Sequence, residues 1–372
     1  MTNTTKQFDV IIIYSGSIAN SAKDKKYKEF APFPPKGRYA IYNDSYEYLF
    51  KKCKKLNLSV AFATSKDIIG PGLFKSFWTF DRKWIRNSQK AYSRILFDKF
   101  TPVFKKQVEK FKLLTSSKDI HLFNHKALTN IFQNKLNTYT CFKDLTIPTV
   151  EITSPSKKDI KSAKIELEKQ LKNNKFKGDF VDGFLVKNII GTGGFKIHRI
   201  NFDEYGLNEI KKSYTTDTRH TKVLSYILQP FIDCTKGFVF GKYSGLIDLR
   251  LIILNHTIIQ TYIRIAKKGK FRCNEHQGGN LIYMPLKIIP QDVLAMIKKI
   301  INRLDTIMDL KHSLYSLDFI KSNNGNLYFI EGNTSPGIDW NHNKKQNEIK
   351  SKELIDIIVG ELKSIALDKK TA

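Results

Sequence analysis

The chain of 372 residues is 41% hydrophobic, which is enough apolar material to bury a substantial core in two or three domains. Its net charge of +28 indicates an acidic partner such as a nucleotide, a polyanionic substrate, a nucleic acid or a membrane surface, unless the lysines only coat exposed helices. Four cysteines without C-x-x-C spacing argue against a zinc site and favour a reducing, cytoplasmic setting, and no apolar run approaches the ~18 residues of a membrane span.

The first predicted domain, residues 1–115, opens with a β-α-β pattern. Hydrophobic patterning predicts a strand at 8–14 (FDVIIIY), a helix at 45–56 and a strand at 58–64 (LSVAFAT). This order indicates an open α/β sheet. The aromatic cluster Trp78, Phe80 and Trp84 could stack nucleic-acid bases, but packing in a core or a domain interface is the interpretation we favour.

The second predicted domain covers residues 116–225 and the third covers residues 226–372. In the second domain, the pattern predicts helices at 127–136 and 159–171 and strands around a glycine-rich loop within 180–200. In the third domain, it predicts strands at 224–229, 237–242, 246–254 and 258–265 and helices at 292–308 and 353–365.

Residues 316–333 (SLDFIKSNNGNLYFIEGN) predict a β-hairpin that sets two carboxylates face to face. Asn324-Gly325 is a favoured two-residue turn, and the register that it sets places Asp318 opposite Glu331. Asn333 lies two residues beyond Glu331 and therefore points to the same side. Facing like charges destabilise a sheet, so we expect a cation between them, and rigid oxygen ligands suit Mg²⁺. The alternative is a surface hairpin with solvated acids.

A second motif joins a lysine to a glycine-rich turn. Lys187 ends the apolar stretch 184–187 and is followed by Gly191-Thr192-Gly193-Gly194. Backbone N–H groups of such a turn can approach phosphate oxygens closely, and the lysine adds a charge for the same anion. By itself this motif fits a flexible hairpin tip equally well.

A third motif is rich in arginine. Asp248 and Arg250 share a face of one predicted strand, and the polar loop 267–279 holds Arg272 and Asn274. Guanidinium groups suit the charge on a transferring phosphoryl group, whereas structural salt bridges are the alternative. Arg264, on the return strand, is predicted to lie on the face opposite Arg250 unless a bulge intervenes.

Together these motifs resemble the ATP-grasp ligases, and within them the RimK-type amino-acid (glutamate) ligases and glutathione synthetase. The likeness covers residues 123–341 and rests on Asp-x-Arg, Arg-small-Asn before His-x-Gly-Gly, and Glu-x-Asn before Ser-Pro-Gly. It implies an α/β and α+β protein of the ATP-grasp fold. Its parts would be an N-terminal open α/β (pre-ATP-grasp) domain, a small lid domain and a C-terminal mixed-sheet domain.

The resemblance also implies roles for individual residues. The implied ATP-binding residues are Lys126, Lys187, Gly193, Gly194, Gln229, Phe231, Ile232, Asp248, Arg272 and Asn274. The implied catalytic residues are Arg250, Arg272 and Asn274, and the implied ligands of two Mg²⁺ or Mn²⁺ ions are Asp318, Glu331 and Asn333. His125, His276 and Asp339 are weaker candidates for a proton acceptor.

The activity that the resemblance implies is ATP-dependent amide formation through an acyl phosphate, with release of ADP and phosphate. We expect amino acids or small peptides as substrates, possibly acidic ones, and a homo-oligomer is compatible with this. Two alternatives stay open. One is an ATP-grasp kinase for a polyanion such as an inositol phosphate, and the other is a basic protein that binds nucleic acid or another polyanion.

Overall fold

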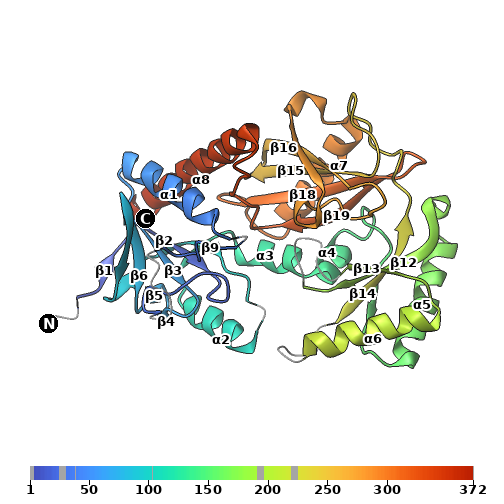
Figure 1. The fold of residues 1–372 in the computed structure, drawn as a ribbon, viewed down its shortest axis with the longest axis horizontal. Helices are drawn as coiled ribbons and strands as arrows, with labels where there is room; N and C mark the ends of the chain where they lie inside the picture. The colour runs from blue at the N-terminus through green and yellow to red at the C-terminus, as the bar shows by residue number, and fades with distance from the viewer. Residues whose placement is uncertain are drawn as a thin grey trace. The chain divides into compact units, whose positions relative to one another are not determined.

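The computed structural model describes residues 4–24, 31–37, 39–102, 104–190, 197–218 and 225–371. Contacts divide the chain into two compact units, Met1–His125 with Ser335–Ala372, and Lys126–Thr334 (Figure 1). The predicted domain boundaries at 115/116 and 225/226 stay a prediction. The C-terminal helix α8 (Lys345–Thr371), expected at 353–365, begins earlier and packs on α1 (Tyr42–Lys55) in the first unit.

The first unit is built on a six-stranded sheet with the strand order β10-β9-β2-β3-β6-β7, and a small sheet with the order β1-β8-β5-β4 accompanies it. The large sheet contains β2 (Val10–Tyr14), β3 (Val60–Thr64), β6 (Phe77–Asp81), β7 (Lys83–Asn87), β9 (Ile95–Lys99) and β10 (His121–Phe123). The small sheet contains β1 (Lys6–Gln7), β4 (Ile68–Gly70), β5 (Leu73–Phe74) and β8 (Ala91–Tyr92), and α2 (Lys105–Leu114) packs on β4.

Strand β2 lies inside the large sheet and pairs in parallel with β3 and β9. All five of its residues are buried, which explains a continuous apolar run in place of the alternation of a half-exposed strand. The predicted strands at 8–14 and 58–64 and the helix at 45–56 are thus confirmed. Trp78 and Trp84 are buried on β6 and β7, so the aromatic cluster packs in the core as expected.

The second unit holds two sheets (Figure 1). The four-stranded sheet has the order β11 (Val150–Ile152), β14 (Tyr226–Ile232), β12 (Phe180–Asn188), β13 (Ile197–Ile200). The five-stranded sheet has the order β17 (Asn280–Met284), β16 (Thr257–Ile265), β15 (Ile247–Leu254), β18 (Leu314–Lys321), β19 (Leu327–Asn333). The helices are α3 (Lys126–Gln133), α4 (Lys135–Cys141), α5 (Lys157–Lys172), α6 (Glu204–Thr218) and α7 (Gln291–Asp305), and the short 3-10 helices are η1 (Lys177–Asp179), η2 (Glu275–Gln277) and η3 (Leu286–Ile288).

The second unit differs from the prediction in four places. The single helix expected at 127–136 is two helices, because the Asn134 side chain accepts hydrogen bonds from the backbone N–H groups of Leu136 and Asn137 and starts α4. Residues 237–242 form no strand and contribute only an isolated bridge between Phe240 and Tyr243. Helix α6 and strand β17 were not predicted.

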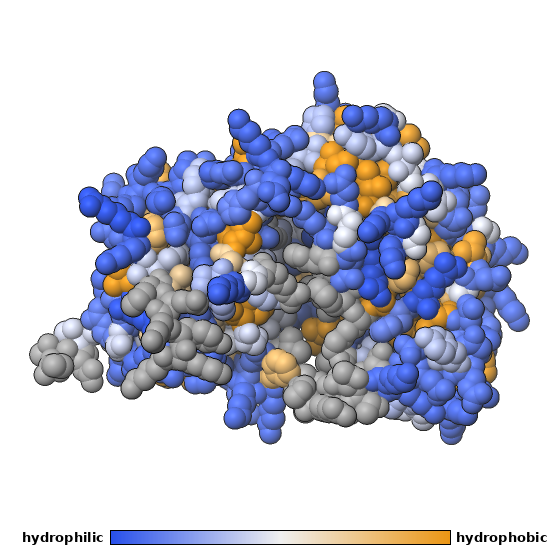
Figure 2. Space-filling view, viewed as in Figure 1, coloured by the Kyte–Doolittle hydropathy of each residue, from blue (hydrophilic) through white to orange (hydrophobic). Residues whose placement is uncertain are grey.

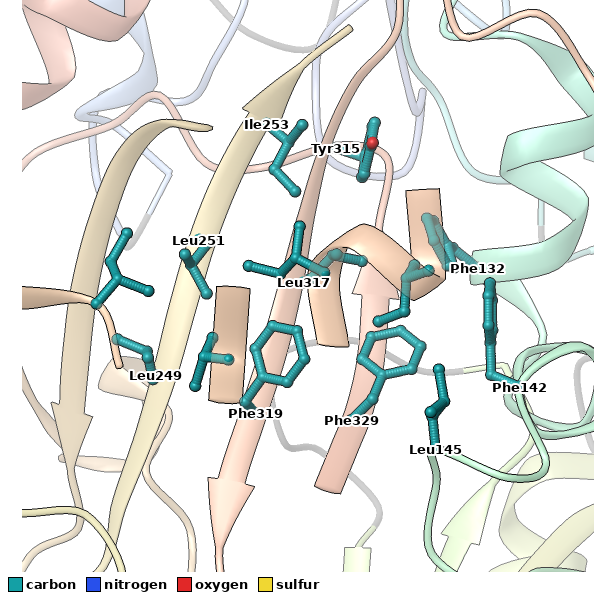
Figure 3. Close-up of a cluster of buried hydrophobic side chains, with 14 of the residues drawn as sticks. Phe132, Phe142, Leu145, Leu249, Leu251, Ile253, Tyr315, Leu317, Phe319 and Phe329 are labelled. Atoms are coloured by element: carbon teal, nitrogen blue, oxygen red, sulfur yellow. The ribbon is translucent and has the colours of Figure 1, made fainter. Parts of the chain in front are cut away.

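Alternation along the central strands separates an apolar face from a charged face. Odd-numbered residues such as Leu249, Leu251, Leu317 and Phe319 enter the core of the second unit, together with Phe329 (Figure 3). Helix α7 contributes Val293, Ile297, Ile300 and Leu304 to this core, and α3 contributes Leu128 and Phe132. Because successive side chains of a strand point to opposite faces, the even-numbered Asp248, Arg250 and Asp318 lie on the other side.

The hairpin β18–β19 pairs Asp318 with Glu331, as predicted, but for a different reason. The turn is a three-residue loop, in which the Ser322 N–H donates to the Asn326 carbonyl and only Gly325 has a positive φ of 84°. The predicted two-residue turn is therefore wrong by one residue. A bulge at Ile330, which has no partner on β18, shifts the register back by one residue, so that Asp318 still pairs with Glu331. Without it, Glu331 would share the core face of Phe329.

A second bulge decides the position of Arg264. Strands β15 and β16 meet at a two-residue turn, Asn255-His256, and Ile259 is left without a partner on β15. This bulge pairs Arg264 with Asp248 and places both on the face of Arg250. The expectation that Arg264 lies on the opposite face is therefore wrong, and the bulge is the exception stated with it.

Hydrophilic residues cover most of the face shown in Figure 2, and hydrophobic residues appear there in scattered groups. Across the part of the chain that the structure describes, no helix combines the length and apolar character needed to span a membrane.

Candidate functional site

One cavity in the second unit gathers most of the predicted site residues. The space in it, including its open mouth, is about 970 Å³. Both sheets line it. The polar and charged residues that line it are Lys135, Lys187, Asn188, Asp248, Arg264, Arg272, Asn274, Asp318 and Glu331. The cavity thus combines an acidic wall from β18 and β19 with a basic wall from α4 and β12.

The acidic wall is tied to two buried arginines. Arg250 donates to Asp318 through Nε and Nη2, both at 2.5 Å, and its Nη2 lies 3.7 Å from Oε1 of Glu331. Arg264 donates to Asp248 at 2.6 and 2.9 Å and to Asp318 at 2.6 Å. The cation expected between Asp318 and Glu331 is therefore, in this structure, the Arg250 guanidinium. The salt bridges weighed as the alternative role for these arginines are real.

The two buried acids of this network differ in their number of arginine partners. Burial alone would raise the pKa of Asp318, but Arg250 and Arg264 outweigh it and hold the pKa below its usual range. Burial raises the pKa of Asp248, which Arg264 opposes, and the negative charge of Asp318 raises it further. Asp318 is therefore a firmly ionised carboxylate at the floor of the cavity.

Two lysines form the basic wall. Lys187, on β12, is buried, and this burial lowers its pKa to about 8, although Glu331 acts in the opposite direction. Lys135, the first residue of α4, also has a lowered pKa because of burial, and Glu331 again opposes the shift. Both ammonium groups have therefore lost part of their hydration, and a bound polyanion would supply the favourable contacts that water no longer makes.

Lys126 was expected in this place and is not there. It is exposed at the start of α3 and does not line the cavity. Lys135 was missed because a continuous helix was expected across it. The available signal was Asn134, since Asn is a preferred N-cap residue and marks a new helix start.

The predicted adenine neighbours on β14 divide between two environments. Phe231 and Ile232 line the cavity, and the Phe231 ring lies 3.8 Å below the Arg199 guanidinium. Gln229 does not line it, because its buried side chain points to Thr149 and donates to Oγ1 at 2.7 Å. Gln229 therefore holds the strand in place and does not contact a ligand through its side chain.

The loop after β16 brings Arg272 and Asn274 to the cavity. Arg272 donates to the Gln277 side chain at 3.0 Å and to the carbonyl of Ile197 on β13. A Cβ on Gly279 would lie 1.9 Å from the Cys273 carbonyl, so this turn requires glycine. Gly193 and Gly194 lie outside the described residues, as does the side chain of His276.

The predicted metal ligands contain two carboxylates and one amide. Among the described residues, no three His, Cys, Asp or Glu side chains are close enough together to hold a metal ion. Asn333 pairs with Ser316 at the end of the hairpin and does not line the cavity. Any ion here would thus need oxygens from a ligand, which is how Mg²⁺ is usually held beside phosphates.

Comparison with known proteins identifies relatives of the chain. The RimK-like ATP-grasp domain family matches residues 152–358. The "Probable alpha-L-glutamate ligase" of Pseudomonas entomophila (strain L48) is 30% identical over 122 residues, which are 32% of this chain and 37% of that protein. The protein of the same name from Thioalkalivibrio sulfidiphilus (strain HL-EbGR7) is 28% identical over 123 residues. The match therefore spans about a third of the length of these relatives.

Solved structures resemble the whole chain in fold. D-alanyl-alanine synthetase A from Vibrio cholerae O1 biovar eltor str. N16961 has a TM-score of 0.59 at 12% identity, over 96% of this chain and 99% of that one. A RimK domain protein ATP-grasp from Sphaerobacter thermophilus DSM 20745 has a TM-score of 0.52 at 10% identity, over 95% and 99%. The predicted ATP-grasp fold is confirmed.

Proposed function

The chain belongs to the RimK-like ATP-grasp family, and on this premise we propose that it is an ATP-dependent ligase that joins a carboxylate to an amine. The observation that carries the proposal is the cavity, in which Lys135 and the buried Lys187 stand across from Asp318 and Glu331. One wall suits phosphate oxygens, and the other suits the cation that accompanies them.

Lys187 and Lys135 would bind the phosphates of ATP. Each ammonium is already desolvated, so an arriving phosphate restores favourable interactions without a further desolvation cost to the protein. Phe231 and Ile232 supply an apolar surface at the same cavity, which suits the adenine ring. Lys126 has no part in this arrangement, and Lys135 takes the role first expected of it.

The residues fit Mg²⁺ as a partner of ATP. Asp318 and Glu331 face each other with hard oxygen donors, and Asn333 follows on the same strand. Bound there, Mg²⁺ would neutralise phosphate charge and favour transfer of the terminal phosphoryl group. Arg250 and Arg264 hold the Asp318 carboxylate in one orientation, so the protein side of this site is formed before any ligand binds.

The reaction needs no nucleophile from the protein. A substrate carboxylate oxygen attacks the terminal phosphorus of ATP, and ADP leaves. An amine then attacks the acyl carbon, phosphate leaves, and the nitrogen loses a proton to give the amide. Arg272 and Asn274 line the cavity with donors that can stabilise negative oxygens during both steps. We propose an amino acid or a small peptide as substrate, in line with the glutamate ligase name of the relatives.

A product assay tests this function. Purified protein, Mg-ATP and a panel of amino acids and dipeptides should release phosphate in proportion to a new amide detected by mass spectrometry. Glu331→Gln should lose this turnover while it unfolds at the wild-type temperature, because Glu331 is half-buried and lies 3.7 Å from Arg250, a longer contact than those within the buried network. Lys126→Met serves as the matched control with full turnover.

Two results would contradict the proposal. A phosphorylated product with no amide would assign the cavity to a kinase. Tight, salt-sensitive binding of RNA or DNA with no consumption of ATP across the panel would assign the positive charge to nucleic-acid binding.

A further inference from the structure

The sheet of the first unit has a point at which its strand order reverses. From β2 the chain moves to β3 on one side and only later to β9 on the other side. In open α/β sheets, ligands bind outside the carboxyl ends of the strands at such a point. The carboxyl ends here are Tyr14 of β2 and Lys99 of β9, which are partners in the parallel ladder.

Charged groups cluster at these two strand ends. Asp98 and Lys99 close β9, and the Lys99 ammonium donates to the Pro336 carbonyl at 2.7 Å. Burial raises the pKa of Asp98 to about 7, and burial lowers the pKa of Lys99 to about 8, which Asp339 and Asp98 both oppose. Three ionisable side chains from two distant parts of the sequence therefore lie within electrostatic reach of one another.

Tyrosines orient the acid of this cluster. Tyr42 is hydrogen-bonded to both Asp339 and Tyr14. A carboxylate only accepts, so Tyr42 donates to Asp339. Tyr46 stands beside Tyr14, with 6.2 Å between ring centres, and is fully buried. Its hydroxyl has no hydrogen-bond partner among the described residues. A buried hydroxyl without a partner is costly and points to a missing ligand.

Other charges near the cluster pair among themselves. Lys66 binds Asp24 at 3.0 Å, His342 binds Asp44 at 3.0 Å, and Lys352 binds Glu348 at 2.5 Å. Lys99 interacts electrostatically with two acids, Asp98 and Asp339, and its ammonium donates to a backbone carbonyl. The faces of Tyr14 and Tyr42 add a surface that attracts ammonium groups.

We propose that this cluster binds a free α-amino acid with one carboxylate, its ammonium on Asp339 and its carboxylate on Lys99. The dipolar ligand would match one acid and one base, while a second carboxylate would meet Asp98 without a cation to pair it. The preferred substrate is therefore a neutral or basic amino acid, unlike the glutamate in the name of the relatives. The inference rests on the proposed ligase function only for the use of this amino acid as a reactant.

Calorimetric titration of the full chain, without nucleotide, tests the site. L-alanine, L-leucine and L-lysine are the probes, N-acetyl-L-alanine lacks the ammonium, and L-glutamate carries the second carboxylate. At least one probe should bind. N-acetyl-L-alanine should bind at least about tenfold more weakly, because it loses the charge-assisted contact with Asp339. L-glutamate should also bind more weakly than the probes, because its second carboxylate meets Asp98.

Asp339→Asn should weaken binding about tenfold and still accept the hydrogen bond from Tyr42, so its thermal unfolding should match the wild type. Tyr42→Phe, which frees the Asp339 side chain to turn, should weaken binding by a smaller factor. Asp356→Asn removes an exposed acid of α8 that pairs with Lys52, and it should bind like the wild type.

The inference is overturned if none of the three probes binds, if N-acetyl-L-alanine binds equally well, if L-glutamate binds most tightly, or if Asp339→Asn changes nothing. Measurement of ATP binding and ATP turnover on the same preparation separates the two proposals. ATP-dependent amide formation without binding of a probe would leave the ligase standing and remove this site.

Discussion

The two units use buried charge in opposite ways. In the second unit, Asp248, Arg250, Arg264 and Asp318 bind one another at 2.5 to 2.9 Å. In the first unit, Lys99 donates to the backbone of Pro336, and Asp98 accepts from the backbone of Phe100. In the second unit, the charged side chains thus form a closed network that orients them. In the first unit, Lys99 and Asp98 bond to backbone groups, and we infer that a ligand supplies their charged partners.

This difference predicts different consequences of mutation. Breaking a closed buried network leaves a carboxylate in a site of low polarity, and the main cost is then folding stability. Removing a charge that only a ligand completes costs affinity instead. The same reasoning makes Asp318→Asn a poor test of metal binding, because it also removes the partner of two buried arginines.

The largest expected effect is on stability in the closed network. Arg264→Met should lower the free energy of unfolding of the second unit by about 3 to 5 kcal/mol, because Asp248 loses its bidentate arginine partner and Asp318 loses one of its two arginines. Urea unfolding followed by circular dichroism measures it. Arg303→Met, which breaks a half-exposed pair with Asp144, should cost about 1 kcal/mol or less. Equal costs for both variants would remove the contrast between the two kinds of charge.

The next effect separates the lysines of the cavity. Lys187→Met and Lys135→Met should each weaken ATP binding by about 1.5 to 3 kcal/mol, because each removes a hydrogen-bond donor that carries a full charge. Lys126→Met should bind ATP like the wild type. Titration with ATP and with its non-hydrolysable analogue gives the affinities. An effect of Lys126→Met as large as that of Lys135→Met would restore the assignment first made from the sequence.

Packing behind the hairpin can be tested by one added methyl group. Gly332 lies between Glu331 and Asn333, and a Cβ there would stand 2.3 Å from the Phe132 ring. Gly332→Ala should therefore destabilise the second unit by about 1 to 3 kcal/mol. Gly360→Ala, in α8, meets nothing within 4 Å and should stabilise the first unit by up to about 1 kcal/mol through helix propensity. Thermal unfolding shows whether each variant is less or more stable than the wild type. A stabilising Gly332→Ala would show that the hairpin is loosely packed.

The smallest effect concerns pH and the first unit. Only protonated Lys99 attracts a carboxylate, and burial lowers its pKa to about 8 while Asp98 and Asp339 oppose the shift. Affinity for the bound amino acid should be steady up to about pH 7 and fall by up to about tenfold by pH 9. Lys99→Arg keeps its charge and should flatten this fall. An unchanged pH profile in the arginine variant would exclude Lys99 from the site.

Local sequence patterns predicted most elements of the second unit and only β2, α1, β3 and α8 of the first, since burial leaves a period of two in strands and of 3.6 in helices. They were correct for β2, β3, α5 and α7. They failed where one extra residue in a strand shifts the pairing register between two strands. Ile259 and Ile330 are ordinary isoleucines whose bulges cannot be recognised from local sequence, yet one brings Arg264 to the cavity and the other turns Glu331 toward it.

The sequence by itself determined the family and the chemical character of the site. The two acids of the hairpin, the lysine of β12 and the arginine-rich loop follow from residue types at short spacing, whereas the bulge at Ile330 sets Asp318 and Glu331 face to face. Only the tertiary structure decided which charges neutralise one another and which lysine reaches the cavity. The reason is physical: pairing and burial depend on contacts between residues far apart in the chain, whereas spacing reports only on neighbours.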